Sequence, residues 1–183
     1  DDTIWGPRGP SELFGGDGDD YINDAGGTSW DNTSVDRIDA GPGNDVVQAE
    51  YGDTIILGGD GDDVLRADAW GGYAPPGNDI VDGGAGNDVI SGEGGDDTID
   101  GGAGDDIIRS ESSDNGNTVY GGSGNDQIWG SDKGDTLYGY RNAAASIADG
   151  TDNAADGNDI IYARQGDDVV YGGDGSDQIW GEG

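Results

Sequence analysis

The sequence predicts an all-β fold that is built by stacking many short turns of nine residues each. Three observations predict it: a nine-residue unit recurs along most of the chain, each unit keeps one aliphatic residue in the same phase, and most units open with glycine. Self-similarity at a fixed period is typical of solenoid architectures, in which each repeat packs only against its neighbours.

The repeated unit reads Gly-Gly-x-Gly-(Asn/Asp)-Asp-x-aliphatic-x, and we number its positions from the first glycine. Full units begin at residues 6, 15, 31, 40, 49, 58, 74, 83, 92, 101, 112, 121, 130, 154, 163 and 172. Insertions interrupt the register at 24–30, 67–73, 110–111 and 139–153. Residues 1–5 end an earlier unit and residues 181–183 begin a later one, so we expect residues 1–183 to form a single domain that is a piece of a longer array.

Position eight carries the strongest signal for strands, because every residue there is Ile, Leu or Val. These residues are Ile4, Leu13, Ile22, Ile38, Val47, Ile56, Leu65, Val81, Ile90, Ile99, Ile108, Val119, Ile128, Leu137, Ile161, Val170 and Ile179. Successive side chains of a strand point to opposite faces. Positions seven to nine therefore predict a three-residue strand whose middle side chain points into a thin core.

The glycines of positions one to four predict the turns that connect these strands. Glycine readily adopts positive φ and allows two backbones to approach closely, which tight turns require.

Composition alone would favour a disordered chain. Gly accounts for 40 residues and Asp plus Glu for another 40, against 7 Lys plus Arg; the net charge is -33, and only 31% of the residues are hydrophobic. Low hydrophobicity with high net charge is typical of disorder. A disordered chain has no reason to keep the phase of position eight through four insertions, so we expect a folded repeat.

Several classes of function are disfavoured. The chain has no Cys, Met or His, which removes disulfides, thiolate or imidazole metal sites and Ser-His or Cys-His nucleophiles. We find no apolar run long enough to span a membrane, and the acid excess would repel nucleic acid and anionic lipid. Each acidic pair that could suggest a hydrolase lies in a turn that the repeat already explains, so we expect no enzymatic activity.

The unit resembles the RTX, or haemolysin-type calcium-binding, nonapeptide repeat. The resemblance implies a right-handed parallel β-roll: each nonapeptide makes half a coil, two short parallel sheets face each other across an aliphatic core, and calcium lies in the turns along the two edges. It also implies a protein of bacterial type I secretion, unfolded in the low-calcium cytosol and folded outside the cell.

If two units make one coil, alternate units lie on the same edge. We define the first edge by the position-six residues Asp2, Asp20, Asp45, Asp63, Asp88, Asp106, Asp126, Asp159 and Asp177. The second edge has Ser11, Asp36, Thr54, Asp79, Asp97, Asn117, Asp135 and Asp168. The first edge keeps Asp in every coil and the second loses it three times, so we expect a nearly unbroken column of roughly seven ions on the first edge and fewer on the second. The best candidates on the second edge are Asp79 with Asp97, and Asp135 with Asp168.

The first edge also has the more regular glycine heads. The candidate ligating residues there are Gly58, Gly59, Asp60 and Gly61; Gly83, Gly84, Ala85 and Gly86; Gly101, Gly102, Ala103 and Gly104; Gly121, Gly122, Ser123 and Gly124; and Gly172 with Asp174. By the resemblance, one ion would take carbonyl oxygens from Gly83, Ala85, Gly102 and Gly104, with Asp88 and Asp106. Calcium is a hard cation that takes six to eight oxygen ligands, and Mg²⁺ fits less well because it prefers smaller octahedral sites. We expect about seven to twelve Ca²⁺ in all.

Two functions remain open. The first is a calcium-binding module that folds outside the cell and supports the secretion and folding of a larger exported protein, such as a toxin, lipase, protease or epimerase. The second is a structural repeat of a surface adhesin or an S-layer-type protein. An outward row at position nine could then bind a glycan or a protein: Tyr120, Trp129, Tyr138, Tyr162, Tyr171 and Trp180. A second outward row, Val46, Val64, Val89 and Ile107, could pack on an adjacent domain of the same parent protein.

Overall fold

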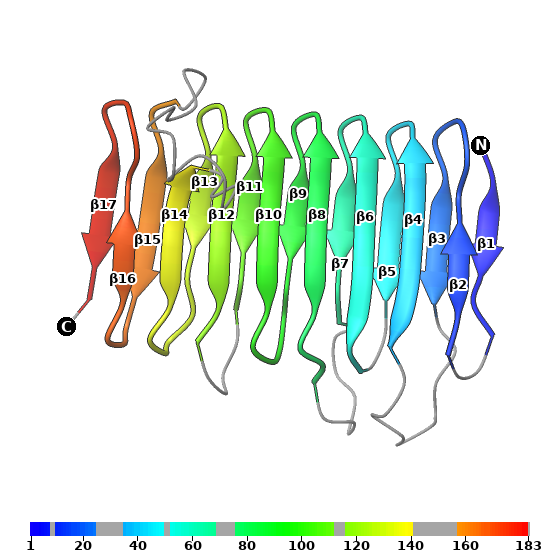
Figure 1. Ribbon diagram of the computed structural model, residues 1–183, viewed down its shortest axis with the longest axis horizontal. Coiled ribbons are helices and arrows are strands. Elements are labelled where there is room, and N and C mark those ends of the chain that lie inside the picture. Colours follow the sequence, from blue (N-terminus) through cyan, green and yellow to red (C-terminus); the bar gives the residue numbers. More distant parts are fainter. Residues whose placement is uncertain are drawn as a thin grey trace, which may run out of the picture.

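The computed structural model describes residues 1–7, 10–24, 35–49, 52–68, 76–111, 116–140 and 157–182. Within these residues the regular secondary structure consists of short strands that alternate between two parallel sheets (Figure 1). The described part of the chain has no helix long and apolar enough to cross a membrane. The all-β parallel β-roll predicted from the repeat is confirmed.

The odd-numbered strands form a nine-stranded sheet in chain order. They are β1 (Thr3–Trp5), β3 (Tyr21–Asp24), β5 (Val46–Ala49), β7 (Val64–Arg66), β9 (Val89–Ser91), β11 (Ile107–Arg109), β13 (Gln127–Trp129), β15 (Ile160–Arg164) and β17 (Gln178–Gly181). Position-eight residues pair with each other throughout, for example Ile90 with Ile108 and Ile108 with Ile128.

The even-numbered strands form the eight-stranded sheet that faces it. They are β2 (Glu12–Phe14), β4 (Asp36–Pro42), β6 (Thr54–Asp60), β8 (Ile80–Ala85), β10 (Thr98–Ala103), β12 (Thr118–Ser123), β14 (Thr136–Tyr140) and β16 (Val169–Tyr171). Because consecutive strands always change sheets, two nonapeptides complete one coil, as expected.

The coil is right-handed. In Figure 1 the even-numbered strands run upward in front and the odd-numbered strands run downward behind, while the chain advances from right to left. A path that rises in front, crosses the top to the back and advances leftward is a right-handed turn, the hand that parallel crossover connections almost always adopt. The even-to-odd connections at the top form the first edge, and the odd-to-even connections at the bottom form the second.

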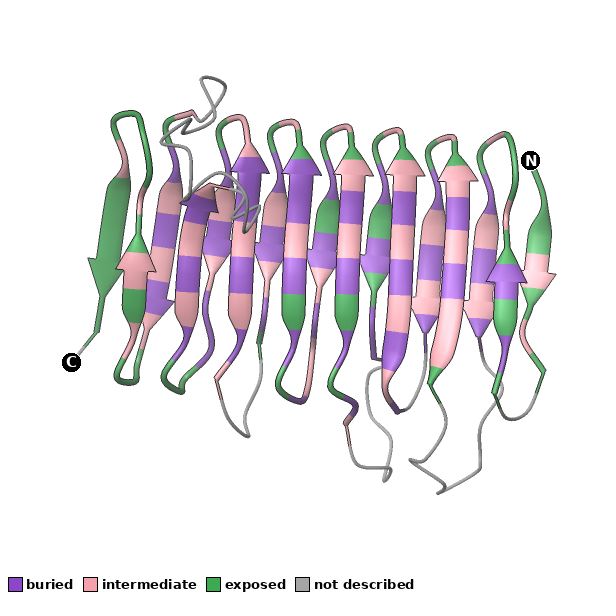
Figure 2. Ribbon diagram, in the orientation of Figure 1, coloured by how far each residue is buried: buried purple, intermediate pink, exposed green. Residues whose placement is uncertain are grey.

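The core is a single layer of aliphatic side chains between the sheets. From Ile22 to Ile161 every position-eight residue is at most 1% exposed, and small Ala40, Ala49, Ala67 and Ala163 extend the layer toward the edges. Figure 2 shows this layer as buried bands that cross both sheets at one height. Toward the ends the burial fades: Leu13 is 9% exposed and Ile179 is 48% exposed.

The longer strands of the even sheet differ from the expected three residues. Strands such as β8 and β10 continue through positions one to three of the next unit, so that Gly84 pairs with Gly102 and Ala85 with Ala103. The glycine head is therefore strand at its start, and the turn is tighter than expected. Positive φ is confined to positions two and four of these heads, as at Gly84 (105°) and Gly86 (138°), and a side chain at either would collide with the carbonyl of the preceding coil.

The insertions begin slightly later than the repeat pattern predicts, because some residues assigned to them belong to strands. Asp24 belongs to β3, and Gly139 and Tyr140 belong to β14. Most of the remaining inserted residues, 25–30, 69–73 and 141–153, lie outside the described part of the chain.

Candidate metal-binding sites along the two edges

A ladder of side-chain hydrogen bonds follows position six along the first edge. The backbone N–H of each position-six residue donates to Oδ1 of the position-six aspartate in the next coil, so each turn is joined to its successor. The bonds run from Asp2 to Asp20 (2.5 Å), Asp20 to Asp45 (2.7 Å), Asp45 to Asp63 (2.7 Å), Asp63 to Asp88 (2.8 Å), Asp88 to Asp106 (2.8 Å), Asp106 to Asp126 (2.9 Å), Asp126 to Asp159 (2.9 Å) and Asp159 to Asp177 (3.1 Å). The structure thus keeps Asp159 and Asp177 in the first-edge column beyond the insertion at 139–153.

The second oxygen of these carboxylates is left over. Oδ2 is buried and accepts no hydrogen bond in Asp20, Asp45, Asp63, Asp88, Asp106 and Asp126, and these residues are at most 3% exposed. A buried, ionised carboxylate oxygen without a partner is costly. A row of such oxygens at one per coil indicates that a cation belongs beside them.

In most units of the first edge, the glycine of position one leaves room in front of Oδ2. A Cβ added at Gly83 would lie 2.5 Å from Oδ2 of Asp88 and closer still to the carbonyl oxygen of Gly101, the position-one residue of the next coil. The same pair of oxygen atoms, one carboxylate and one carbonyl, faces Gly15, Gly58, Gly101, Gly121 and Gly139. Glycine at these positions keeps a side chain out of the space that the oxygens share, whereas the unit of Asp45 has Ala40 at position one.

Burial changes the protonation of the column. Loss of hydration raises the pKa of Asp88 to about 6, of Asp63 and Asp106 to about 7, and of Asp126 to about 8; hydrogen bonds from backbone N–H groups oppose the rise, and neighbouring carboxylates add to it. The pKa of Asp45 is also raised by its burial. Near neutral pH the column can be fully ionised only if positive charge enters it.

The glycine heads of the first edge lie where the repeat predicts, but their carbonyl groups are not all equally free. The position-three carbonyls of Ala85 and Ala103 accept hydrogen bonds from the N–H groups of Gly61 (2.6 Å) and Gly86 (2.7 Å) in the preceding coil. The position-one carbonyl of Gly101 instead faces the space beside Asp88. Two further groups of candidates likewise end strands: Gly58, Gly59 and Asp60 end β6, and Gly121, Gly122 and Ser123 end β12. Gly172 and Asp174 instead lie in the turn between β16 and β17.

The second edge has the same ladder with a gap. Hydrogen bonds join Ser11 to Asp36 (2.6 Å), Thr54 to Asp79 (2.7 Å), Asp79 to Asp97 (3.0 Å), Asp97 to Asn117 (2.8 Å), Asn117 to Asp135 (2.7 Å) and Asp135 to Asp168 (2.9 Å). Between Asp36 and Thr54 the chain instead uses a backbone bond from Asp36 to the carbonyl of Asp53 (3.1 Å). The hydroxyl of Thr54 bonds within its own turn and offers no carboxylate to the column.

The two candidate pairs on the second edge are not equivalent. Oδ2 accepts no hydrogen bond in Asp79 and Asp97, and burial raises their pKa values to about 9 and about 8. In Asp135 both oxygens accept hydrogen bonds from the hydroxyl of Ser131, and Oδ2 also accepts one from its N–H at 2.6 Å. The pair Asp79 with Asp97 is therefore better prepared for a cation than Asp135 with Asp168.

A further ladder at position five was not assigned a role from the sequence. On the first edge, each position-five N–H donates to the side chain of the preceding coil, as from Asn44 to Asp19 (2.9 Å), Asp62 to Asn44 (2.8 Å) and Asn87 to Asp62 (2.7 Å). This ladder is exposed and runs in the opposite direction to the inner one. From Asp19 to Asn125, Asp and Asn alternate along it, which keeps like charges apart, and that alternation was visible in the sequence.

The donor atoms available at the edges are all oxygens, from carboxylates and backbone carbonyls. Oxygen ligands of this kind suit a hard cation such as Ca²⁺. Among the described residues no three acidic side chains cluster closely enough to hold a metal by themselves. A site here would therefore combine carboxylates from successive coils with turn carbonyls.

The outer faces carry the aromatic rows. Trp129, Tyr162 and Trp180 stack on one sheet, with ring centroids 5.5 and 4.8 Å apart, and the guanidinium of Arg109 lies 4.8 Å from the ring centroid of Trp129. Tyr120, Tyr138 and Tyr171 stack on the other sheet with spacings of 4.9 Å. The rings cover one another, so the inner faces of these stacks are not free to pack on a sugar.

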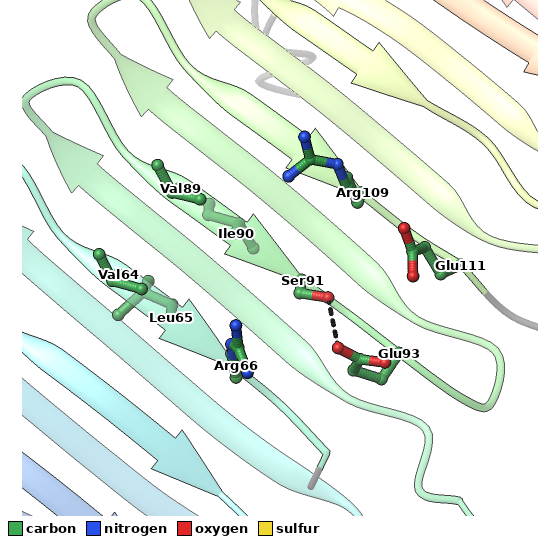
Figure 3. A pocket seen from close by; sticks show the side chains of 9 residues that line it. All are labelled: Val64, Leu65, Arg66, Val89, Ile90, Ser91, Glu93, Arg109 and Glu111. Carbon is green, nitrogen blue, oxygen red and sulfur yellow. Dashed lines mark hydrogen bonds between the residues drawn. The ribbon is translucent and has the colours of Figure 1, made fainter. Parts of the chain in front are cut away.

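The outward valines line a shallow groove on the odd sheet. Val64 and Val89 lie at one end, Glu93 and Glu111 lie at the other, and Arg66 and Arg109 lie between them (Figure 3). The groove encloses about 470 Å³, and Glu93 accepts a hydrogen bond from Ser91 (2.9 Å). Its lining is mixed in charge and does not extend the acidic edges.

Comparison with known families identifies the repeat. The model of the RTX calcium-binding nonapeptide repeat (4 copies) matches residues 1–27, 30–65, 76–108, 112–142 and 153–183. No curated protein and no solved structure matches the chain.

Proposed function

The chain belongs to the RTX calcium-binding nonapeptide repeat family, and we propose that it is a module that folds when Ca²⁺ fills its edges outside the cell. In this role it supports the secretion and folding of a larger exported bacterial protein, such as a toxin, lipase, protease or epimerase. The module itself catalyses no reaction.

The observation that carries the proposal is the first-edge column of buried aspartates with unpartnered Oδ2 atoms. Without cations these carboxylates must either remain ionised in a desolvated row or take up protons. The chain has a net charge of -33, so the unfolded state, in which the carboxylates are hydrated and far apart, is favoured. Calcium reverses the balance because its binding free energy contributes directly to folding.

The same balance explains why such a module suits export. A chain that stays unfolded at cytosolic calcium levels can pass a narrow channel, and the higher calcium outside then folds it. Calcium suits the turns because it accepts irregular shells of six to eight oxygens, whereas Mg²⁺ demands an octahedral shell and keeps its waters.

Calcium titration followed by far-UV circular dichroism and calorimetry tests the proposal. We expect little β signal in chelator, a cooperative rise at millimolar Ca²⁺, and a stoichiometry of about seven to twelve ions. Equal β signal in chelator and in calcium would contradict the proposal.

A further inference from the structure

One turn of the second edge closes on itself without leaving a carboxylate oxygen over. It spans residues 130–135 and carries Asp135 at position six, which is 1% exposed. Oδ1 of Asp135 accepts the N–H of Asn117 (2.7 Å), as in the rest of the ladder. Oδ2 accepts the N–H of Ser131 (2.6 Å), and the hydroxyl of Ser131 lies 3.0 Å from both oxygens. Both oxygens of this buried carboxylate are therefore satisfied by the protein itself.

Ser131 is fixed in a position that directs its donors at this carboxylate. It is fully buried, and its Oγ accepts the N–H of Lys133 (3.2 Å). A serine hydroxyl has one hydrogen to donate, and here that hydrogen goes to Asp135. A cation beside Asp135 would meet the hydrogens of an N–H and an O–H group at the place where it needs oxygen lone pairs.

The turn of Asp97, two coils earlier on the same edge, shows what differs. Both turns have glycine at position one, and in both a Cβ there would collide with Oδ2 of the aspartate. Oδ2 of Asp97 nevertheless accepts no hydrogen bond. Position two is Glu93 in the one turn and Ser131 in the other, and Glu93 has a positive φ of 64° whereas Ser131 does not. The position-two N–H therefore reaches the carboxylate only in the turn of Ser131.

The preceding coil on this edge brings no second carboxylate to the turn. Its position-six residue is Asn117, which is 1% exposed, and the side-chain NH₂ group of Asn117 donates to the carbonyl of Ser110 (3.2 Å). An ion between these two turns would have one carboxylate, which is already hydrogen-bonded through both oxygens. An ion between Asp88 and Asp106 would have two carboxylates whose Oδ2 atoms accept no hydrogen bond.

We propose that Ser131 specifies a calcium-free turn, in which its N–H and hydroxyl take the place that an ion holds beside the other aspartates. The inference rests on the proposed function, because it states which turn of the same edges takes no ion. At this turn the residues do not fit the cation that the repeat implies. The turn can then close in chelator as well as in calcium, and the second edge carries calcium at Asp79 and Asp97 but none at Asp135.

Native mass spectrometry in saturating Ca²⁺ tests the proposal, because it counts single bound ions on the full chain. We expect Asp135→Asn, which keeps Oδ1 for the ladder, to bind the same number of ions as the unmodified chain. The matched variant on the same edge, Asp97→Asn, should bind at least one ion fewer. Equal losses of ions in the two variants would overturn the proposal.

Ser131→Gly supplies the converse test. It removes the hydroxyl and lets position two adopt a positive φ, as Gly84 does (105°), so we expect one additional ion. An unchanged count in this variant would overturn the role of Ser131. Circular dichroism in calcium verifies that each variant is folded, and if Asp135→Asn does not fold, Ser131→Gly decides alone.

The two proposals fail in different ways. If the unmodified chain binds no calcium, the proposed function fails. An ion lost in Asp135→Asn, from a chain that still folds with calcium, leaves that function intact and refutes only the calcium-free turn.

Discussion

Replacing Asp126 by asparagine should change stability in opposite directions with and without calcium. Asp126 is fully buried on the first edge, and its Oδ1 accepts the N–H of Asp106 (2.9 Å). Asparagine keeps that oxygen but replaces the unpartnered Oδ2 with an uncharged NH₂ group, beside the space that Oδ2 shares with the carbonyl of Gly139. The substitution therefore removes the charge and leaves the ladder in place.

The size of the effect in chelator follows from the pKa. Burial, together with the charges of Asp106 and Asp159, raises the pKa of Asp126 to about 8 from 3.8. Each pKa unit corresponds to about 1.4 kcal/mol, so an ionised Asp126 destabilises the metal-free fold by up to about 6 kcal/mol in alkaline solution. Asp126→Asn removes that cost and should make the metal-free chain easier to fold.

In calcium the sign reverses. If the carboxylate bridges two ions, and each ion at 100 times its Kd contributes about 2.7 kcal/mol, the substitution removes up to about 5 kcal/mol of linked stability. We expect the calcium midpoint of the circular dichroism transition to rise at least about ten-fold. The residual far-UV circular dichroism signal in chelator and urea unfolding in saturating calcium measure the two signs separately.

The matched control is Asp105→Asn. Asp105 lies on the exposed position-five ladder and accepts hydrogen bonds from Asn125, which lower its pKa. Its loss should leave the calcium midpoint within about two-fold, because it faces solvent. Equal shifts in the two variants, or no shift in Asp126→Asn, would refute the assignment of the inner column to calcium.

Three further outcomes are expected. In chelator the chain should gain β structure as the pH falls from about 8 to about 4, because groups such as Asp63 (pKa about 7, against 3.8 unfolded) bind more protons in the folded state. This stabilisation is complete below about pH 4 and is lost as the pH rises through 7. A metal-free circular dichroism signal that weakens toward acid would contradict the expectation. Ile108→Ala should lower the free energy of unfolding in saturating calcium by about 2–5 kcal/mol, since Ile108 is fully buried between Ile90 and Ile128. A loss of less than about 1 kcal/mol in urea titration would mean that the core layer is not closely packed there. Gly84→Ala should destabilise strongly because its φ is 105° and the new Cβ would meet the carbonyl of Gly59, whereas Gly181→Ala, which has open space, should melt like the unmodified chain.

Much of the fold could be predicted because the constraint is local and repeated. The middle side chain of each three-residue strand is buried at a fixed position of the nine-residue unit. That position therefore requires an aliphatic residue in every unit, and the pattern reveals both the strands and their phase. Sorting position six by alternate units then places Asp88 and Asp106 on one edge, and the structure puts them in successive coils.

What the repeat could not predict comes from residues outside it or from contacts between coils. Asp24 and Asp68 lie where the repeat is interrupted. Only the folded structure shows that Asp24 accepts a hydrogen bond from the hydroxyl of Ser11, at a position where the second edge lacks its own aspartate. The continuation of β8 into its glycine head also depends on pairing with β10. A single turn viewed alone carries no information about that pairing.

The alternation of strands between two sheets has a consequence for how such a chain can change in length. Removing residues 83–100, which are two whole units, would join Asp82 to Gly101 and return every later strand to its original sheet. Removing only residues 83–91 would transfer every later turn to the opposite edge. Asp97 would then follow Asp63, and the later members of the first-edge and second-edge columns would change places. Gains and losses of eighteen residues therefore preserve the unbroken first-edge column of aspartates, whereas a step of nine would bring Asn117 into it.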